Sequence, residues 1–432
     1  MHGRFNLFQR QILNWGHHHP YNAMMLWKLT GPLDADRLRA AVEAVPSLER
    51  ITGLKVDRRG RWYEYVGGQP FQIDVVDARA DEVSVLRATF EDYMNRALKR
   101  RVENPARFVL VECGASHHYV GLCIDHLIGD LKTGEMILRR VVSRYRGLPD
   151  PMGRLAFEFY PPTYRRLYRR AFGPLRLLGA TWDFGRTWLG YRRVHRTRGP
   201  TIPGLWCSWR HATVPAGTMT RVRSFAAHHG ASTHDVFLAA LMEAAGNHFT
   251  ERFDHPHRRG IAVGAVADLR PLARREMDNV LGVFLGYFTV AHPAPERLDF
   301  ADLVRLVAQR AVVVREQAVY IRNLLHMQVG TLFWPHMTQR AQVRLYGKFS
   351  PVVGGLSTAN VRAFSRRRRE RVGLLDVIRG PSCGPALPMV MLPTRIGDDL
   401  NVTVTFRPSA IPDERMEAIL ADYVRRLAAL ET

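Results

Sequence analysis

The stretch from Arg107 to Tyr145 changes its periodicity midway, and this change constrains the fold more than any other feature of the chain. Two apolar runs, Arg107–Cys113 and Tyr119–Ile124, are separated by five residues that include Gly114, a pattern typical of a β-hairpin. From Thr133 to Tyr145, apolar residues recur at helical spacing. The pattern therefore predicts a hairpin whose second strand leads through a short turn into an amphipathic helix.

The turn between this strand and this helix carries His126 and Asp130, four residues apart. A histidine at a strand end can be held rigidly, and its imidazole, with an ordinary pKa of ~6.5, can take a proton from an attacking hydroxyl or amine. The spacing alone does not distinguish this interpretation from a structural histidine, so both stay open at this point.

Strand and helix patterns alternate along the whole chain in two halves of similar size, which predicts an α/β fold built from two sandwich lobes. We expect a first lobe over residues 1–174, a basic and aromatic crossover over 175–204, and a second lobe over 205–432. The expected strands lie near Met24–Leu29, Phe71–Val76, Arg107–Cys113, Tyr119–Ile124, Arg210–Val214, Ile261–Ala267, Val283–Val290 and Leu400–Phe406. The expected helices lie near Ala35–Ala44, Glu82–Ala97, Thr133–Tyr145, Met219–His228, Thr233–Phe249 and Phe300–Ile321.

The order of strand, His-x-x-x-Asp turn and helix resembles the condensation-domain and chloramphenicol acetyltransferase-like acyltransferase superfamily, which includes wax ester synthases and polyketide-associated acyltransferases. Six further segments resemble that family in the same order: Pro20–Leu38, Ala231–Ala240, Gly260–Pro271, Asn279–Phe284, Leu356–Val361, and Leu400–Phe406 with the helix after Ile411. The resemblance covers nearly all 432 residues. It implies two chloramphenicol acetyltransferase-like lobes arranged in a V, with the His-x-x-x-Asp turn in a central tunnel.

The resemblance implies transfer of an acyl group from a thioester to a hydroxyl or amine, without a covalent acyl-enzyme, in bacterial natural-product or lipid biosynthesis. His126 is the expected acid–base residue, and Asp130 is the second motif residue, expected to pair with Arg270 and hold the turn in shape. Contacts to the oxyanion or to the acceptor are expected from Ser357, Thr358 and Asn360. The chain has no Gly-x-Ser-x-Gly element, which argues against a serine hydrolase.

Two positions depart from the pattern of condensation domains, which usually carry two adjacent histidines and a glycine after the aspartate. Here Asp125 precedes His126, and Leu131 follows Asp130. The retained second histidine supports an active enzyme, and the loss of the first histidine and of the glycine favours an acyltransferase relative over an ordinary peptide-bond-forming module. The alternative is a catalytically degenerate relative that binds carrier proteins as an accessory.

The formal net charge of +22 predicts attraction to an anionic partner, because a positive field recruits negatively charged surfaces. Between Tyr160 and Pro200 there are ten arginines and a single acid, interleaved with large apolar residues. This segment is either a crossover packed on the core or a surface for an acidic acyl or peptidyl carrier protein or an anionic membrane. Candidate partner-binding or phosphate-binding residues are Arg165, Arg166, Arg169 and Arg170 and, in a second basic run, Arg367 and Arg368, for which a solvated loop is the alternative. Nucleic acid is not expected, since no nucleic-acid-binding signature accompanies the charge.

The four cysteines lack paired metal spacing, so neither a zinc site nor disulfides are expected. No permanently bound cofactor is expected, and acyl-coenzyme A or a phosphopantetheinyl carrier protein would serve as the donor substrate. No run is long enough to span a bilayer, and the first residues do not form a signal-peptide core. We therefore expect a cytoplasmic protein, with peripheral contact to an anionic membrane left open.

Overall fold

The structure is a computed structural model that divides into two compact units. Unit 1 comprises Met1–Tyr164, Leu269–Phe284 and Val361–Ser382, and unit 2 comprises Arg165–Asp268, Leu285–Asn360 and Cys383–Thr432. The structure describes residues 2–16, 18–57, 60–98, 104–153, 155–159, 189–197, 206–273, 276–320, 323, 336–338, 340–342, 344–345, 351–361, 372–384 and 387–431. The predicted first lobe, residues 1–174, did not include Leu269–Phe284 and Val361–Ser382, which belong to unit 1.

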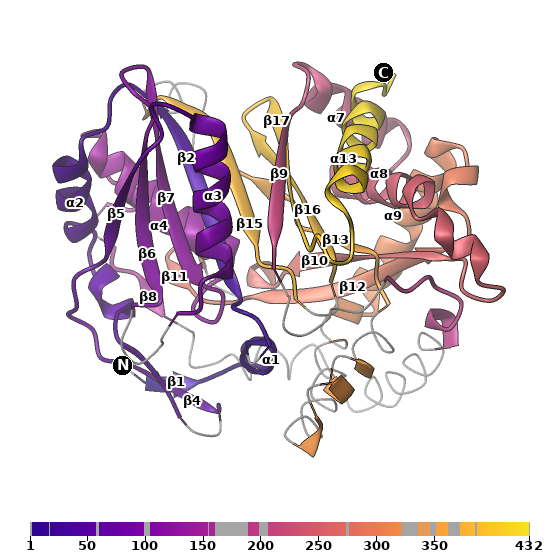
Figure 1. Cartoon of the computed structure of the whole chain (residues 1–432), viewed down its shortest axis with the longest axis horizontal. Coiled ribbons are helices and arrows are strands. Elements are labelled where there is room, and N and C mark those ends of the chain that lie inside the picture. The colour runs from indigo at the N-terminus through magenta and orange to yellow at the C-terminus, as the bar shows by residue number, and fades with distance from the viewer. Residues whose placement is uncertain are drawn as a thin grey trace. The chain divides into compact units, whose positions relative to one another are not determined.

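A five-stranded sheet forms the centre of unit 1, in the order β15-β2-β7-β6-β5 (Figure 1). These strands are β15 (Leu374–Pro381), β2 (Asn22–Thr30), β7 (His117–Asp125), β6 (Ala106–Glu112) and β5 (Ile73–Asp77). Only the β5–β6 pair is parallel within this sheet. Nearly every residue of β6 and β7 is buried, as expected for central strands that are covered on both faces.

The long helices α3 (Glu82–Asn95) and α4 (Leu131–Tyr145) cover opposite faces of this sheet (Figure 1). The thiol of Cys123 points to the carbonyl of Tyr93 on α3, and the His118 ring contacts the hydroxyl of Tyr145 on α4. Side chains alternate between the two faces of a sheet along a strand, and residues 118 and 123 of β7 are five positions apart. Their side chains therefore point to opposite faces of the sheet. A further helix, α2 (Ala35–Glu43), packs against α4.

Smaller elements complete unit 1. They are β1 (His2–Arg4), α1 (Leu7–Trp15), the short 3₁₀ helix η1 (Leu48–Ile51), β3 (Leu54–Val56) and β4 (Trp62–Tyr65), then β8 (Glu158–Phe159), η3 (Arg270–Leu272) and β11 (Val280–Leu281). The parallel pairing of β8 with β11 joins the 269–284 segment to residues that follow α4.

Unit 2 contains a second mixed sheet, in the order β12-β10-β13-β16-β17-β9, with β14 also paired to β16. Its strands are β9 (Ser208–Thr213), β10 (Ile261–Asp268), β12 (Leu285–His292), β13 (Gly354–Leu356), β14 (Ala359–Asn360), β16 (Met389–Ile396) and β17 (Asp399–Phe406). Among the described residues of unit 2, the helices are α7 (Thr218–His228), α8 (Thr233–His248), α9 (Phe300–Glu316) and α13 (Asp413–Ala428), with the 3₁₀ helices η2 (Thr250–Asp254) and η4 (Pro295–Arg297).

Helix α8 is the central helix of the unit 2 core. It begins at a reciprocal capping box, in which Ser232 and Asp235 each accept a hydrogen bond from the other's backbone. Val236, Leu238 and Leu241 are completely buried among residues from α9, α13 and the sheet. A continuous apolar core of this kind supplies the main favourable term in folding.

The predicted α/β class and the presence of two α/β units are confirmed. The V-shaped arrangement and the tunnel stay predictions. Two local expectations were wrong. The hairpin turn spans only residues 113–116, with Gly114 at φ +105°, so His117 and His118 already pair with β2 in β7. Helix α9 ends at Glu316 instead of near Ile321, because Ala318 adopts a left-handed φ of +50°.

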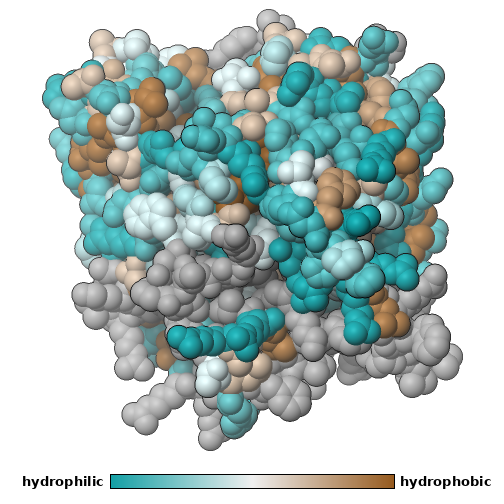
Figure 2. Space-filling view, turned by 45° about the vertical axis from the view of Figure 1, so that its right-hand side comes forward, coloured by the Kyte–Doolittle hydropathy of each residue, from teal (hydrophilic) through white to brown (hydrophobic). Residues whose placement is uncertain are grey.

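Among the described residues, none of the helices combines the length and the apolar character that a bilayer crossing requires. The described surface seen in Figure 2 is mainly hydrophilic, with hydrophobic residues in scattered small groups. Such dispersion is normal for surfaces that face water.

Candidate active site

The candidate site is built where β7 ends in the centre of the unit 1 sheet. The backbone N–H of Asp125 donates to the carbonyl of Pro105 at 2.7 Å, and that of His126 donates to the carbonyl of Tyr21 at 2.8 Å. The strand end is thereby tied to the segments that precede both neighbouring strands. The Gln9 side chain donates to the carbonyl of Leu127 at 2.7 Å, so the turn is also held from α1.

His126 itself lies almost entirely inside the protein. The residue is 5 % exposed, and its ring lies 5.3 Å from the ring of Tyr21, which is in turn 5.3 Å from that of Trp15. Its Nδ1 atom is buried and makes no hydrogen bond of regular geometry with a described residue. Burial lowers the pKa of His126 below its usual value, although nearby backbone groups and the carboxylates of Asp130 and Asp125 oppose this. The imidazole is therefore neutral near pH 7 and able to accept a proton.

Asp130 lies four residues further on and is fully engaged by other groups. Arg270 donates from Nη1 to Oδ2 at 2.8 Å and from Nη2 to Oδ1 at 2.9 Å, a bidentate ion pair in which both side chains are buried. Oδ1 also accepts the N–H of Thr133 and so caps α4, while Oδ2 accepts the N–H of Phe284 at 3.0 Å. Burial raises the pKa of Asp130, but Arg270 and these hydrogen bonds hold it below its usual value.

A second layer of contacts joins the start of α4 to the 269–284 segment. The Thr133 hydroxyl donates to the carbonyl of Gly282 at 2.8 Å and accepts the Gly282 N–H at 3.0 Å. The guanidinium of Arg270 lies over the ring of Phe284, 4.6 Å from its centroid. Residues that are far apart in the sequence thus fix Asp130 with its carboxylate directed away from solvent.

The two departures from the condensation-domain pattern have local structural explanations. Asp125 is 2 % exposed, and its Oδ1 accepts the N–H of Leu127 at 2.9 Å, which stabilises the turn. Leu131 is the first residue of α4, whose N-terminus is already capped by Asp130. With these two residues present, His126 directly follows β7 and Asp130 is the N-cap of α4.

The structure brings His126, Asp130 and Arg270 together within unit 1. Ser357, Thr358 and Asn360 belong to unit 2, where Thr358 contacts the ring of His234 at 3.2 Å and Asn360 lies on β14, so their contact with reactants stays a prediction. The predicted partner-binding or phosphate-binding residues Arg165, Arg166, Arg169, Arg170, Arg367 and Arg368 lie outside the described residues. A cavity of about 520 Å³ lies between the α7–α8 turn and α9, and none of the predicted site residues lines it.

The sequence did not indicate the residues that support the motif. Tyr21 and Gly282 contact this region through their main chains and Gln9 through its side-chain amide, and no local chemical motif marks these residues as supports of the turn. A signal was present for Thr133, because an aspartate three residues before a threonine at the start of an apolar periodic run is typical of a capped helix.

Comparison with known proteins supports the fold. No protein-family model matches the chain, and the search of curated proteins found no match. Among solved structures, the first condensation domain of the calcium-dependent antibiotic synthetase, in complex with a substrate analogue, is 16 % identical, with a TM-score of 0.71, over 99 % of this chain and 97 % of that one. The epimerization domain from the third module of tyrocidine synthetase B is 12 % identical, with a TM-score of 0.70, over 100 % and 96 %.

A third similar structure is the SgcC5 protein from Streptomyces globisporus, 17 % identical with a TM-score of 0.67, over 99 % of this chain and 98 % of that one. These matches span both units and nearly the full length of each compared chain. The resemblance predicted from the sequence is confirmed at the level of the fold: this chain has the fold of condensation domains.

Proposed function

We propose that this protein is an acyltransferase that moves an acyl group from a thioester to a hydroxyl or amine acceptor, in natural-product or lipid biosynthesis. The donor is carried on an acyl or peptidyl carrier protein or on coenzyme A. The condensation-domain fold supports this class of reaction, and the His-x-x-x-Asp turn supplies the residues for it.

The observation that carries the proposal is the contrast between the two motif residues. The carboxylate of Asp130 is bound by Arg270 and two backbone N–H groups, whereas burial lowers the pKa of His126 and keeps its ring neutral. A group saturated with hydrogen-bond donors is a poor base, and a neutral imidazole with a lowered pKa is available to accept a proton. His126 is therefore the base, and Asp130 is a positioning residue.

In the proposed reaction, the acceptor oxygen or nitrogen attacks the thioester carbonyl carbon while His126 takes the acceptor's proton. The tetrahedral oxyanion then collapses, the carbon–sulfur bond breaks, and the departing thiolate receives the proton from His126. The imidazole returns to its neutral form, so one cycle consumes one thioester and releases one thiol and one ester or amide. No acyl-enzyme forms, because the acceptor attacks the donor directly.

Intact-mass spectrometry of the donor tests this proposal. A carrier protein loaded with an acyl group, and separately an acyl-coenzyme A, is incubated with the protein and a panel of amines and alcohols. We expect the donor to lose the mass of its acyl group only when protein and a suitable acceptor are both present. Carrier protein that binds tightly but is never discharged, with acyl-coenzyme A also left intact, would instead favour the catalytically degenerate accessory.

A further inference from the structure

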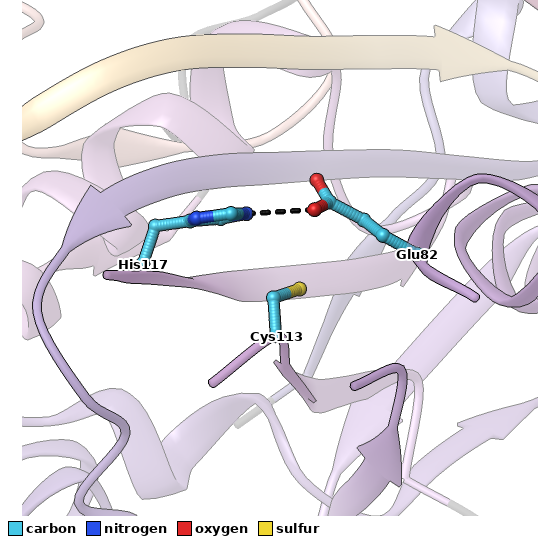
Figure 3. A group of neighbouring side chains, drawn as sticks. All are labelled: Glu82, Cys113 and His117. Carbon is cyan, nitrogen blue, oxygen red and sulfur yellow. Dashed lines mark hydrogen bonds and ion pairs between the residues drawn. The ribbon is translucent and has the colours of Figure 1, made fainter. Parts of the chain in front are cut away.

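A second cluster of reactive side chains lies at the opposite end of β7 from His126. Glu82 is the first residue of α3, Cys113 directly follows β6, and His117 is the first residue of β7. Their potential ligand atoms all lie within 4.8 Å of one another. Figure 3 shows the carboxylate of Glu82 and the ring of His117 pointing toward each other, with Cys113 beside them.

We propose that Glu82, Cys113 and His117 form a binding site for a divalent transition metal, with Zn²⁺ as the ion whose chemistry fits best. Zinc accepts carboxylate, imidazole and thiolate ligands in one tetrahedral site, and three protein ligands leave one position for water or another donor. A soft thiolate and an imidazole together exclude the hard cations Mg²⁺ and Ca²⁺ as preferred ions.

The hydrogen bonds around Glu82 leave one oxygen for the metal. Lys28 at 3.1 Å and the hydroxyl of Tyr119 at 2.7 Å both bind Oε1. Oε2 instead faces Nε2 of His117 at 2.8 Å. The ammonium group of Lys28 therefore orients the carboxylate from the far side, and the metal would replace the proton between Oε2 and Nε2.

His117 is also oriented for ligation. Its Nδ1 atom is 2.9 Å from the hydroxyl of Ser116, so the hydroxyl can fix the ring with Nε2 directed at the cluster. Metal-binding histidines usually have such a partner on the second ring nitrogen. Gly114, at φ +105°, turns the chain so that Cys113 and His117 meet across the hairpin.

Small movements suffice to complete the site. Donor atoms around tetrahedral zinc lie about 3.3 to 3.6 Å apart, given metal–ligand distances of about 2.0 to 2.3 Å. The Oε2–Nε2 separation must open slightly, and the sulfur of Cys113 must move inward from its position 3.8 Å from the carbonyl of Val111. All three side chains are partly exposed, so they can adjust and a metal ion can reach them.

In the metal-free state, the cluster holds a proton on sulfur. Burial, and next the charge of Glu82, raise the pKa of Cys113 to about 11. Metal binding would displace that proton to solvent, since the thiolate is the ligand. With zinc bound, the charges of Glu82, the thiolate and Zn²⁺ sum to zero, so exchanging the thiol proton for the ion raises the local charge by one unit and leaves no net positive charge in the cluster beside Lys28.

The sequence did not predict this site, because only Cys113 and His117 are near one another in the chain and no second cysteine accompanies them. His117 is nine residues from His126 along β7, which at ~3.3 Å per residue places the site about 30 Å away. We therefore infer a structural role, in which the metal pins the hairpin turn to the start of α3.

Calorimetric titration of the full chain with Zn²⁺ after chelator treatment tests the site. We expect one high-affinity equivalent in the wild type that is lost in Cys113→Ser and in His117→Gln. Ser116→Ala should keep the site but weaken Zn²⁺ binding about 10- to 100-fold, as for other partners of metal-binding histidines. Two matched controls lie outside the cluster and should bind Zn²⁺ like the wild type: Glu112→Gln, at a partly exposed sequence neighbour of Cys113, and His257→Asn, at an exposed histidine elsewhere in the chain.

Two further readouts exclude adventitious binding to other histidines. Co²⁺ should give a thiolate-to-metal charge-transfer band in the wild type and in both controls, and none in Cys113→Ser. Zn²⁺ should raise the melting temperature of the wild type but not of Cys113→Ser, because a ligand that binds the folded state stabilises it. Equal Zn²⁺ affinity in the wild type and Cys113→Ser, or Co²⁺ binding without the thiolate band, would overturn the proposal. Because none of these readouts uses acyl transfer, their outcome is independent of the proposed function.

Discussion

At the scale of single residues, the motif histidine and aspartate differ in what surrounds them. The ring of His126 packs beside Tyr21 and is neutral near pH 7, because burial lowers its pKa. Asp130 is ionised, because Arg270 and backbone N–H groups stabilise its charge. The same turn thus holds His126, a base with a lowered pKa, and Asp130, a carboxylate that binds Arg270 and backbone N–H groups.

The lowered pKa of His126 predicts an unusually acid-tolerant activity. A base works in its neutral form, and a pKa below the ordinary imidazole value of 6.5 keeps that form present at lower pH. We expect the acidic limb of the kcat/KM profile, which reports the free enzyme, to have its midpoint below pH 6.5. A midpoint at or above that value would show that another group controls the limb, or that His126 is not desolvated in the active state.

The Asp130–Arg270 pair predicts a loss of stability when either partner is removed alone. Removing one member of a buried ion pair costs roughly 3 to 5 kcal/mol, because the other charge is left uncompensated. Arg270→Met should therefore lower the free energy of unfolding, measured by urea denaturation, as should Asp130→Asn. In the double variant Asp130→Asn/Arg270→Met we expect a smaller loss than the sum of the two.

The stability that Asp130→Asn loses relative to the wild type should depend on pH. A carboxylate with a depressed folded pKa stabilises the protein above its unfolded pKa, and this contribution disappears as pH falls through the folded pKa. The difference between wild type and Asp130→Asn should shrink in acid. Unchanged melting of an inactive Asp130→Asn variant would instead assign Asp130 a direct role in catalysis.

At the scale of elements, the turn depends on how closely the strand and helix approach. Gly129 lies against α4, and a Cβ atom there would come within 2.5 Å of the Thr133 side chain. Thr133 in turn binds Gly282, so a displacement at Gly129 would reach the 269–284 segment. The small residue between the two motif positions is therefore required by the packing.

Two glycines of the same region offer a matched comparison. Gly129→Ala should destabilise the fold by about 1 to 3 kcal/mol, since overpacking of a filled site costs that much. Gly134 lies inside α4, where a new Cβ would meet only the Ile124 side chain at 4.0 Å. Gly134→Ala should be neutral or stabilise by up to ~1 kcal/mol, because alanine is the better helix former. Thermal unfolding of both variants measures these changes in stability. An equal change in Gly129→Ala and Gly134→Ala would contradict the packing account.

Local patterns in the sequence were enough to predict some elements of the site. The strands β6 and β7 and the helix α4 were predicted to within two residues at most boundaries, because their apolar periodicity is regular. The pairing of β15 with β2 was not predicted, since it joins opposite ends of the chain and leaves no local signal. The same reason explains why Tyr21 and Gly282 were missed, while the pairing of Asp130 with Arg270 was expected only from the family resemblance.

At the scale of the whole molecule, the net charge of +22 is the dominant long-range property. A field of this size speeds the encounter with an acidic partner, and it does not by itself identify that partner. The arginines Arg165, Arg166, Arg169 and Arg170 carry part of this charge within a segment that also contains aromatic residues. We infer that electrostatic attraction contributes to the capture of a carrier-bound donor.

This attraction predicts a strong dependence on salt for a carrier-bound donor. Charges on a surface are screened over ~8 Å at physiological ionic strength, so the Michaelis constant for a loaded carrier protein should rise steeply with added salt. Replacing Arg165, Arg166, Arg169 and Arg170 by glutamine should also raise the Michaelis constant for the loaded carrier protein. A small free thioester is the control donor, and its Michaelis constant should not change. Equal losses with both donors would show that the segment shapes the fold or the active site instead.

The central claim is that His126 carries the proton in acyl transfer, and single-turnover kinetics of the variant His126→Gln test it most directly. Glutamine has a similar size but cannot act as a base at neutral pH, and the melting temperature of the variant serves as the folding control. We predict that the folded variant transfers the acyl group about 10²- to 10⁴-fold more slowly than the wild type, the usual contribution of a general acid–base group. A folded His126→Gln variant that discharges the thioester to the acceptor at the wild-type rate would contradict the account.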